Sequence, residues 1–183
     1  MSFRFNRHEL SGLVLIEQQT FEDQRGFFKE FYRYDLFAEQ GITATFVQDN
    51  VSVTAKDVLR GLHFQYPPKA QAKLVTVLHG TIIDIVVDLR RASPSYRQWT
   101  ALELPASTHR ALYVPEGFAH GFLAMENDTM VLYKCSALYD PQLEGGIRWN
   151  DPGIGIIWPI SAPQLSHKDS ILPFIDELSE PPF

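Results

Sequence analysis

Prolines and glycines cut this chain into short apolar runs, and this feature restricts its fold more than any other. The 12 prolines and 11 glycines are spread over 183 residues and do not gather into a linker. Most runs between them have the length of a β-strand, and few are long enough for a helix of several turns. The pattern predicts many short strands, as in a sandwich or a barrel.

The clearest pair of strands is Lys73–Leu78 and Thr81–Leu89, separated by a two-residue turn. In the second run, apolar residues alternate with Asp84 and Asp88, which is the period of a strand. Further strands are expected at Leu13–Gln18, Gly26–Phe31, Phe46–Thr54, Gln98–Leu104, Ala111–Val114, His120–Ala124, Met130–Ser136 and Ile154–Ile157.

Helix signals are few. One short helix is expected at Tyr34–Gln40, where Gly41 stops it, and another at Ser170–Leu178, which Pro173 interrupts. So little helix beside so many strands indicates an all-β chain.

Charge and cysteine content exclude several classes of protein. The net charge of -6 argues against a general nucleic-acid or membrane-surface role, which usually needs a basic face. The early apolar run Leu13–Ile16 is too short for a membrane span and lacks the features of a signal peptide. Cys135 is the one cysteine, which agrees with a reducing compartment. We expect a single cytoplasmic domain over residues 1–183.

The densest group of chemically active side chains is Arg60-Gly61-Leu62-His63-Phe64-Gln65. On a strand, His63 and Gly61 would face the same way, unless Gly61 marks a bulge. Arg60 and Lys73 lie among apolar strand residues, where an unpaired charge is costly. A purely structural role is therefore hard to assign to these two cations.

A second polar stretch, Pro115-Glu116-Gly117-Phe118-Ala119-His120, places a histidine after a tight turn. With the β-rich pattern it resembles the cupins, jelly rolls that often hold a metal with a His-x-His pair, a glutamate and a later histidine. Here Gln65 follows His63 in place of the second histidine, and Lys73 lies near the expected acidic ligand. A cation beside a divalent metal is unfavourable. We expect a jelly-roll β-barrel with a few short helices and no metal.

Several segments together resemble a narrower family, the dTDP-4-dehydrorhamnose 3,5-epimerases, and they occur in the family's order along nearly the whole chain. They are Asp23–Glu30, Gln48–Asn50, Arg60–His63, Gln71–Val75, Pro115–Phe122, Ile147–Pro152 and Leu165–Asp169. The resemblance implies inversion of carbons 3 and 5 of dTDP-4-dehydro-6-deoxyglucose through an enolate, without any cofactor.

The resemblance also implies the catalytic groups. His63 matches the base, and the ordinary pKa of histidine, about 6.5, suits proton removal near neutral pH. Asp169 matches a carboxylate that orients this imidazole, and Tyr133 matches the acid that protonates from the opposite face. Lys73 and His120 resemble the groups around the keto oxygen, where developing negative charge needs stabilisation.

The remaining expected site residues bind substrate. Asp84 is expected to orient Lys73 or His120, and the resemblance implies that Tyr139 stacks on thymine. By resemblance, the nucleotide and its diphosphate contact a set of charged, amide and aromatic side chains. This set is Arg25, Phe28, Glu30, Gln48, Asp49, Asn50, Arg60, Glu144 and Lys168.

Taken without the resemblance, several of these residues have ordinary structural explanations. A strand histidine such as His63 is as readily structural as catalytic, and a buried Tyr133 needs only one hydrogen bond. Asp169 could cap the last helix, Glu144 could be a solvated loop residue, and Arg25 could belong to a turn.

Three other functions stay open at this point: a sibling enzyme that inverts one carbon or moves the ketone, a metal-dependent cupin oxygenase, and a non-catalytic sugar-binding module. The tyrosine at position 133 favours double inversion. By analogy with the family we expect a homodimer, in which the strand Leu13–Gln18 pairs at its edge with a neighbour's sheet.

Overall fold

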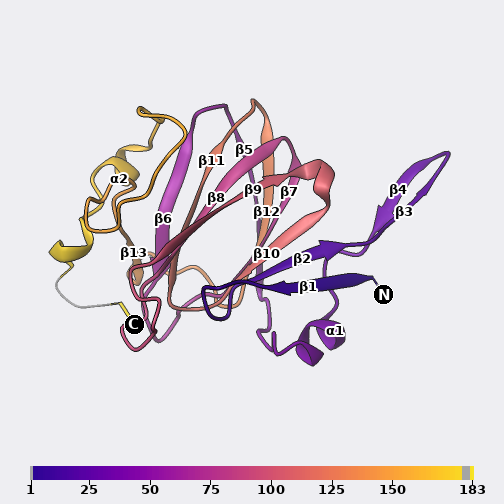
Figure 1. Cartoon of the computed structure of the whole chain (residues 1–183), viewed down its shortest axis with the longest axis horizontal. Helices are drawn as coiled ribbons and strands as arrows, with labels where there is room; N and C mark the ends of the chain where they lie inside the picture. Colours follow the sequence, from indigo (N-terminus) through magenta and orange to yellow (C-terminus); the bar gives the residue numbers. More distant parts are fainter. Residues whose placement is uncertain (1, 179–181) are drawn as a thin grey trace.

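Two antiparallel sheets form the body of the molecule, and a hairpin projects from it (Figure 1). The structure, a computed structural model, describes residues 2–178 and 182–183. Its strands are β1 Phe3–Arg7, β2 Val14–Gln18, β3 Thr20–Asp23, β4 Gly26–Lys29, β5 Gln48–Thr54, β6 Leu59–Gln65, β7 Lys73–His79, β8 Thr81–Asp88, β9 Trp99–Pro105, β10 Arg110–Val114, β11 Phe118–Ala124, β12 Thr129–Cys135 and β13 Glu144–Gly146. The helices are α1 Tyr34–Glu39 and α2 His167–Ser170, with 3-10 turns η1 Ala106–Thr108 and η2 Ile175–Glu177.

The six-stranded sheet has the order β1-β2-β10-β7-β12-β5, and the five-stranded sheet has the order β13-β6-β11-β8-β9. Strands β3 and β4 make the projecting hairpin. The predicted all-β fold with few short helices is confirmed. Apart from Ile154–Ile157, the expected strands are present, with ends that agree to about two residues.

Strand β8 is buried on both faces, and this determines where its carboxylate lies. Ile82 and Val86 pack between the two sheets, whereas Ile85 and Val87 pack on the outer side against the C-terminal segment. Because side chains alternate along a strand, Asp84 belongs with the inner set. The row that contains Ile85 and Val87 therefore faces outward. The row that carries Asp84 faces the space between the sheets.

A bulge sets the register of β6 and β11. The pairing of these strands shifts between His120 and Phe122. A Cβ atom at Gly121 would lie 2.6 Å from the carbonyl oxygen of Arg60, and one at Gly61 would lie 2.6 Å from the Cα of Gly121. Gly61 also has a φ of 136°, which glycine adopts without strain. Two glycines thus let the backbones approach and place His63 opposite His120.

Two expected elements near the C-terminus are wrong. Residues Ile154–Ile157 lie in turns and coil, because Ile154 packs on the outer face of the five-stranded sheet without a strand partner. The expected helix Ser170–Leu178 is replaced by α2, which ends at Ser170, and η2, with Pro173 between them. In the described ranges, no helix is long and apolar enough to cross a membrane.

The expected edge pairing through Leu13–Gln18 is also wrong. Strand β2 is flanked on both sides, because β1 pairs along one edge and β10 along the other. Its backbone groups are therefore already used within the chain. The edge strand on this side of the sheet is β1, a strand that the sequence analysis did not predict.

Candidate active site

A cavity of about 530 Å³ is bounded by strands of both sheets and by α2. A smaller recess of about 260 Å³ shares His63, Lys73 and Tyr133 with it. The cavity is lined by residues of β5, β6, β7, β11, β12, β13 and α2, so segments far apart in the sequence converge there.

His63 and Asp169 are paired at the wall of this cavity. Nε2 of His63 lies 2.6 Å from Oδ1 of Asp169, whose side chain is 6% exposed, against 27% for His63. Burial alone would raise the pKa of Asp169, but the hydrogen bond and charge of His63 outweigh it and leave that pKa lowered. The N–H of Asp169 donates to Oγ of Ser166 at 3.0 Å, which caps α2 and fixes the carboxylate.

A second histidine–carboxylate pair lies beside the first. Nε2 of His120 is 2.9 Å and 3.1 Å from the two carboxylate oxygens of Asp84. The Asp84 side chain is fully buried. Because His120 faces His63 across the strand pairing, the two imidazoles approach one cavity from neighbouring strands.

Lys73 and Tyr133 complete the inner part of the cavity. Burial lowers the pKa of Lys73, and the charges of Cys135 and Asp84 only partly offset this effect. In the described part of the chain its ammonium has no carboxylate partner in an ion pair. Burial also raises the pKa of Tyr133, so its phenol keeps its proton well into alkaline solution. Lys73 is partly buried, and a cation in such a position without an ion-pair partner is favoured by a ligand anion that neutralises it.

The outer part of the cavity carries a chain of polar contacts. Lys168 forms an ion pair with Glu144. The hydroxyl of Tyr139 donates to the other oxygen of Glu144 at 2.6 Å. Burial would raise the pKa of Glu144, but the hydrogen bonds from Lys168 and Tyr139 leave it lowered. Arg60, which also lines the cavity, donates through Nε to Thr54 at 3.1 Å.

Strand β5 divides its polar residues between two faces. Gln48 and Asn50 line the smaller recess, and Nε2 of Gln48 donates to Oδ1 of Asn50 at 3.0 Å. Asp49 lies on the other face and pairs with Lys134 at 2.7 Å. The structure thus brings Gln48 and Asn50 to the site and directs Asp49 away from it.

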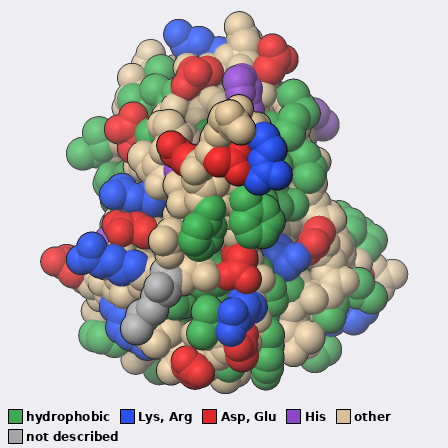
Figure 2. All heavy atoms as spheres, turned by 90° about the vertical axis from the view of Figure 1, so that its right-hand side faces the viewer, with side chains coloured by type: hydrophobic (Ala, Val, Ile, Leu, Met, Phe, Trp, Pro, Cys, Tyr) green, Lys and Arg blue, Asp and Glu red, His purple; other side chains and the backbone are tan. Residues whose placement is uncertain are grey.

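Three expected site residues lie away from the cavity of their own chain. Arg25 and Phe28 are on the projecting hairpin β3–β4, and Glu30 follows it. The Arg25 side chain is 86% exposed and pairs with Asp23, while Phe28 is 67% exposed. Figure 2 shows the molecule from the side of this projection, where hydrophobic side chains lie among charged ones.

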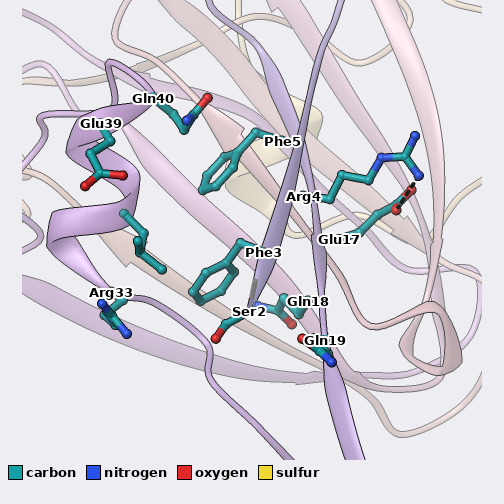
Figure 3. A pocket seen from close by; sticks show the side chains of 11 residues that line it. Ser2, Phe3, Arg4, Phe5, Glu17, Gln18, Gln19, Arg33, Glu39 and Gln40 are labelled. Carbon is teal, nitrogen blue, oxygen red and sulfur yellow. Dashed lines mark ion pairs between the residues drawn. The ribbon is translucent and has the colours of Figure 1, made fainter.

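A larger hollow of about 940 Å³ lies elsewhere, between β1, β2 and α1 (Figure 3). Phe3 and Phe5 line it, and Arg4 and Glu17 form an ion pair of 3.8 Å at one side. It contains none of the expected site residues. Size alone would therefore point to the wrong part of the molecule.

Sequence reasoning missed two residues that hold the site together. Ser166 caps the helix of Asp169, and the Ser-x-x-Asp spacing of a helix start could have identified it. Gln65 is buried and binds two loops beside the cavity, for which no local pattern exists. Over residues 2–178 and 182–183, no cluster of three or more His, Cys, Asp or Glu is arranged to hold a metal ion.

The β-barrel fold and the two histidine–carboxylate pairs of the cavity are typical of an enzyme that catalyses proton transfer. The sequence profile of the dTDP-4-dehydrorhamnose 3,5-epimerases matches residues 7–177. The epimerase of Methanothermobacter thermautotrophicus is 48% identical over 158 residues, covering 86% of this chain and 85% of that protein. The chain belongs to the dTDP-4-dehydrorhamnose 3,5-epimerase family, whose members are isomerases.

Solved structures agree with this assignment. The Bacillus anthracis epimerase with TDP and PPi bound has a TM-score of 0.92 at 44% identity, covering 94% of this chain and 99% of that one. The Legionella pneumophila enzyme in complex with dTDP-4-keto-L-rhamnose has a TM-score of 0.92 at 38% identity, covering 96% and 94%. The predicted jelly roll and the predicted family are both confirmed.

Proposed function

We propose that this chain inverts carbons 3 and 5 of dTDP-4-dehydro-6-deoxyglucose, giving dTDP-4-dehydro-L-rhamnose. The 4-keto group acidifies the protons on both neighbouring carbons, so the reaction needs a base, an acid and a partner for the enolate oxygen. One observation carries the proposal: Nε2 of His63 lies 2.6 Å from buried Asp169 at the wall of a cavity that Tyr133 also lines.

The pairing with Asp169 supports Nδ1 of His63 as the base atom. If Nε2 of His63 donates its proton to the carboxylate, Nδ1 carries the free lone pair and takes the proton from carbon. Asp169 then stabilises the imidazolium that forms. Tyr133 delivers a proton to the other face of the same carbon, and its raised pKa keeps it protonated until that step. The carbon has then lost one proton and gained another, with inverted configuration.

The enolate oxygen is the second requirement. Lys73, a partly buried cation without an ion-pair partner in the described chain, would stabilise its negative charge. His120, held by Asp84 through Nε2, would add a second polar contact. No electron leaves the substrate in this sequence, so the chemistry calls for no redox cofactor.

The nucleotide would occupy the outer cavity and the recess. Arg60 and Lys168 suit the diphosphate, Gln48 and Asn50 suit polar atoms of the base, and Tyr139 suits its face. The Bacillus anthracis relative, which holds TDP and PPi, supports a nucleotide diphosphate as the ligand class.

Solvent isotope exchange tests the function. After incubation with the substrate in heavy water, deuterium should be found at both carbons of the product. Exchange at one carbon only, with good turnover, would identify a single-carbon epimerase. Absence of exchange at either carbon would remove the proposal.

We also propose that the chain works as a homodimer. Arg25 and Phe28 lie on a hairpin that extends away from their own cavity, so they could bind nucleotide only in a neighbouring copy. Phe21 and Phe27 on the same hairpin are 50% and 57% exposed, and burying them against a partner would be favourable.

Complementation tests the shared site. Chains with Arg25→Ala and chains with His63→Asn should each be nearly inactive alone, and their co-expression should restore activity through mixed dimers with one intact site. A monomer in light scattering, or failure of a proven mixed dimer to recover activity, would exclude a shared site.

A further inference from the structure

Gln65 is a buried amide whose hydrogen bonds all go to loops at the cavity edge. The residue is 2% exposed and lies two positions after His63 on β6. Its Nε2 donates to the carbonyl oxygens of Lys69 at 2.5 Å and Leu138 at 3.1 Å. Its Oε1 accepts from the N–H of Asp140 at 2.9 Å. The amide thus uses both donors and its acceptor within the protein.

Two of these contacts bracket Tyr139. Leu138 and Asp140 are its chain neighbours, and the N–H of Tyr139 itself donates to Oε1 of Gln48 at 2.8 Å. Three successive residues are therefore fixed by glutamine amides. The Tyr139 residue is 52% exposed, and its hydroxyl binds Glu144. A ring with so little packing takes its position mainly from its backbone.

The two loops are also joined by hydrogen bonds between other residues. The N–H of Ala72 donates to Oγ of Ser136 at 2.8 Å, and Nε2 of Gln71 donates to the carbonyl of Ala137 at 2.8 Å. Gln65 binds the same loops through its side-chain amide, from the strand that carries His63. Breaking a buried contact of this kind costs more than breaking a solvated one, because the freed groups cannot bind water.

We propose that Gln65 is a positioning residue for the nucleotide: it holds the backbone around Tyr139 so that the ring meets the base. This rests on the proposed function. A glutamate at the position would keep an acceptor for Asp140 but would face two carbonyl oxygens without a donor. The charged variant is therefore a sharper test than a simple truncation.

The experiment measures binding of dTDP and of pyrophosphate by calorimetry, with steady-state kinetics. Gln65→Glu and Gln65→Leu should each weaken dTDP binding and raise KM about tenfold, with pyrophosphate affinity and kcat little changed. Gln142→Glu, the same change on an exposed side chain of the same loop, should change none of these. In a Tyr139→Ala background, Gln65→Glu should add little further loss of dTDP affinity.

The outcomes separate the inference from the function. If the wild-type chain does not bind dTDP, the proposed function fails. If it binds and the Gln65 variants bind equally well, the positioning role is overturned. Equal loss of dTDP and pyrophosphate binding with a collapse of kcat would indicate general damage and overturn it too. Should the variants not fold, hydrogen exchange in the ligand-free wild type decides: slow exchange at the amides of Tyr139 and Asp140 is expected, and fast exchange overturns the role.

Discussion

His63 and His120 lie directly opposite each other on β6 and β11, and each contacts a carboxylate from a different part of the chain. Asp169 reaches His63 from α2, and Asp84 reaches His120 from β8. The two pairs differ in exposure, since the His63 side chain is 27% exposed and the His120 side chain 9%. The more accessible imidazole is thus the better placed to exchange a proton with a ligand.

Replacing the carboxylate behind His63 should affect turnover and spare binding. We expect Asp169→Asn to lower kcat by about 10²–10⁴, because the amide stabilises the imidazolium poorly and favours the wrong tautomer. Affinity for dTDP should stay within about threefold. The matched control is His167→Asn, an exposed residue of the same helix, which should leave kcat unchanged. Wild-type turnover in Asp169→Asn would contradict the pairing as a catalytic device.

The same pair makes stability depend on pH. The folded pKa of Asp169 is lowered below its ordinary value of 3.8, so the ionised carboxylate stabilises the fold above that pH. This contribution should be lost as the pH falls through the lower folded value. Urea unfolding of the wild type and Asp169→Asn from pH 6 to about 2 measures it. The stability difference between them should shrink toward the acid end, and a constant difference would argue against the shift.

Removing the phenol should separate proton removal from inversion. We expect Tyr133→Phe to lower epimer formation by about 10²–10⁴, because no acid remains on the second face. His63 can still take a proton and return deuterium to the same face, so exchange into recovered substrate should persist. Tyr113→Phe is the control, since that tyrosine is also partly buried but packs on the outer face of the six-stranded sheet. Equal loss of exchange and inversion would show that Tyr133 acts before the proton leaves.

Lys73 should lower the stability of the folded protein and raise the rate of the reaction. Its lowered pKa means that the ammonium is less favourable in the folded chain than in the unfolded chain. We expect Lys73→Met to raise Tm by a few degrees, since about 1 kcal/mol shifts Tm by about 2–4 °C at this size, and to lower kcat by about 10² or more. Calorimetry and initial rates measure the two effects. Loss of both stability and activity would assign Lys73 a structural role.

The close backbone contact between Gly61 and Gly121 should be needed for both stability and turnover, because it positions His63 and His120. In Gly121→Ala the new Cβ would lie 2.6 Å from the Arg60 carbonyl and 2.8 Å from the Leu62 side chain. We expect a loss of about 1–3 kcal/mol in urea unfolding and a lower kcat, because β6 and β11 must separate. Gly155→Ala, which has open space but a φ of +71°, should lose about 1 kcal/mol and keep kcat. Unchanged turnover in Gly121→Ala would show that the histidines tolerate strand separation.

Short-range patterns allowed most of the fold to be predicted. Alternation and Pro/Gly punctuation located the strand that carries His120 and the hairpin that carries Lys73 and Asp84, because each strand is bounded locally, whereas the strand that carries His63 was considered only conditionally. The run Ile154–Ile157 misled because apolar residues are needed to cover a sheet face as well as to form a strand. Strand β13 was missed because Glu144-Gly145-Gly146 has no apolar alternation.

The site could not be predicted from local patterns alone. His63 and Asp169 are 106 positions apart, and only the resemblance to a family joined them. No periodicity reports such a contact, since it depends on how the C-terminal segment folds back. The same holds for Gln65, whose partners lie on loops that strand patterns do not place.

The helix that carries Asp169 makes proton transfer depend on a segment that lies outside the two sheets. Strands β1 to β13 end at residue 146, so both sheets can form from residues that precede Asp169. A protein whose strands have paired would therefore still lack the carboxylate partner of His63 until α2 docks. The same segment covers the outer face of the five-stranded sheet, where Ile154 and Ile175 pack with Ile85 and Val87, so completion of the catalytic pair and burial of that face are coupled.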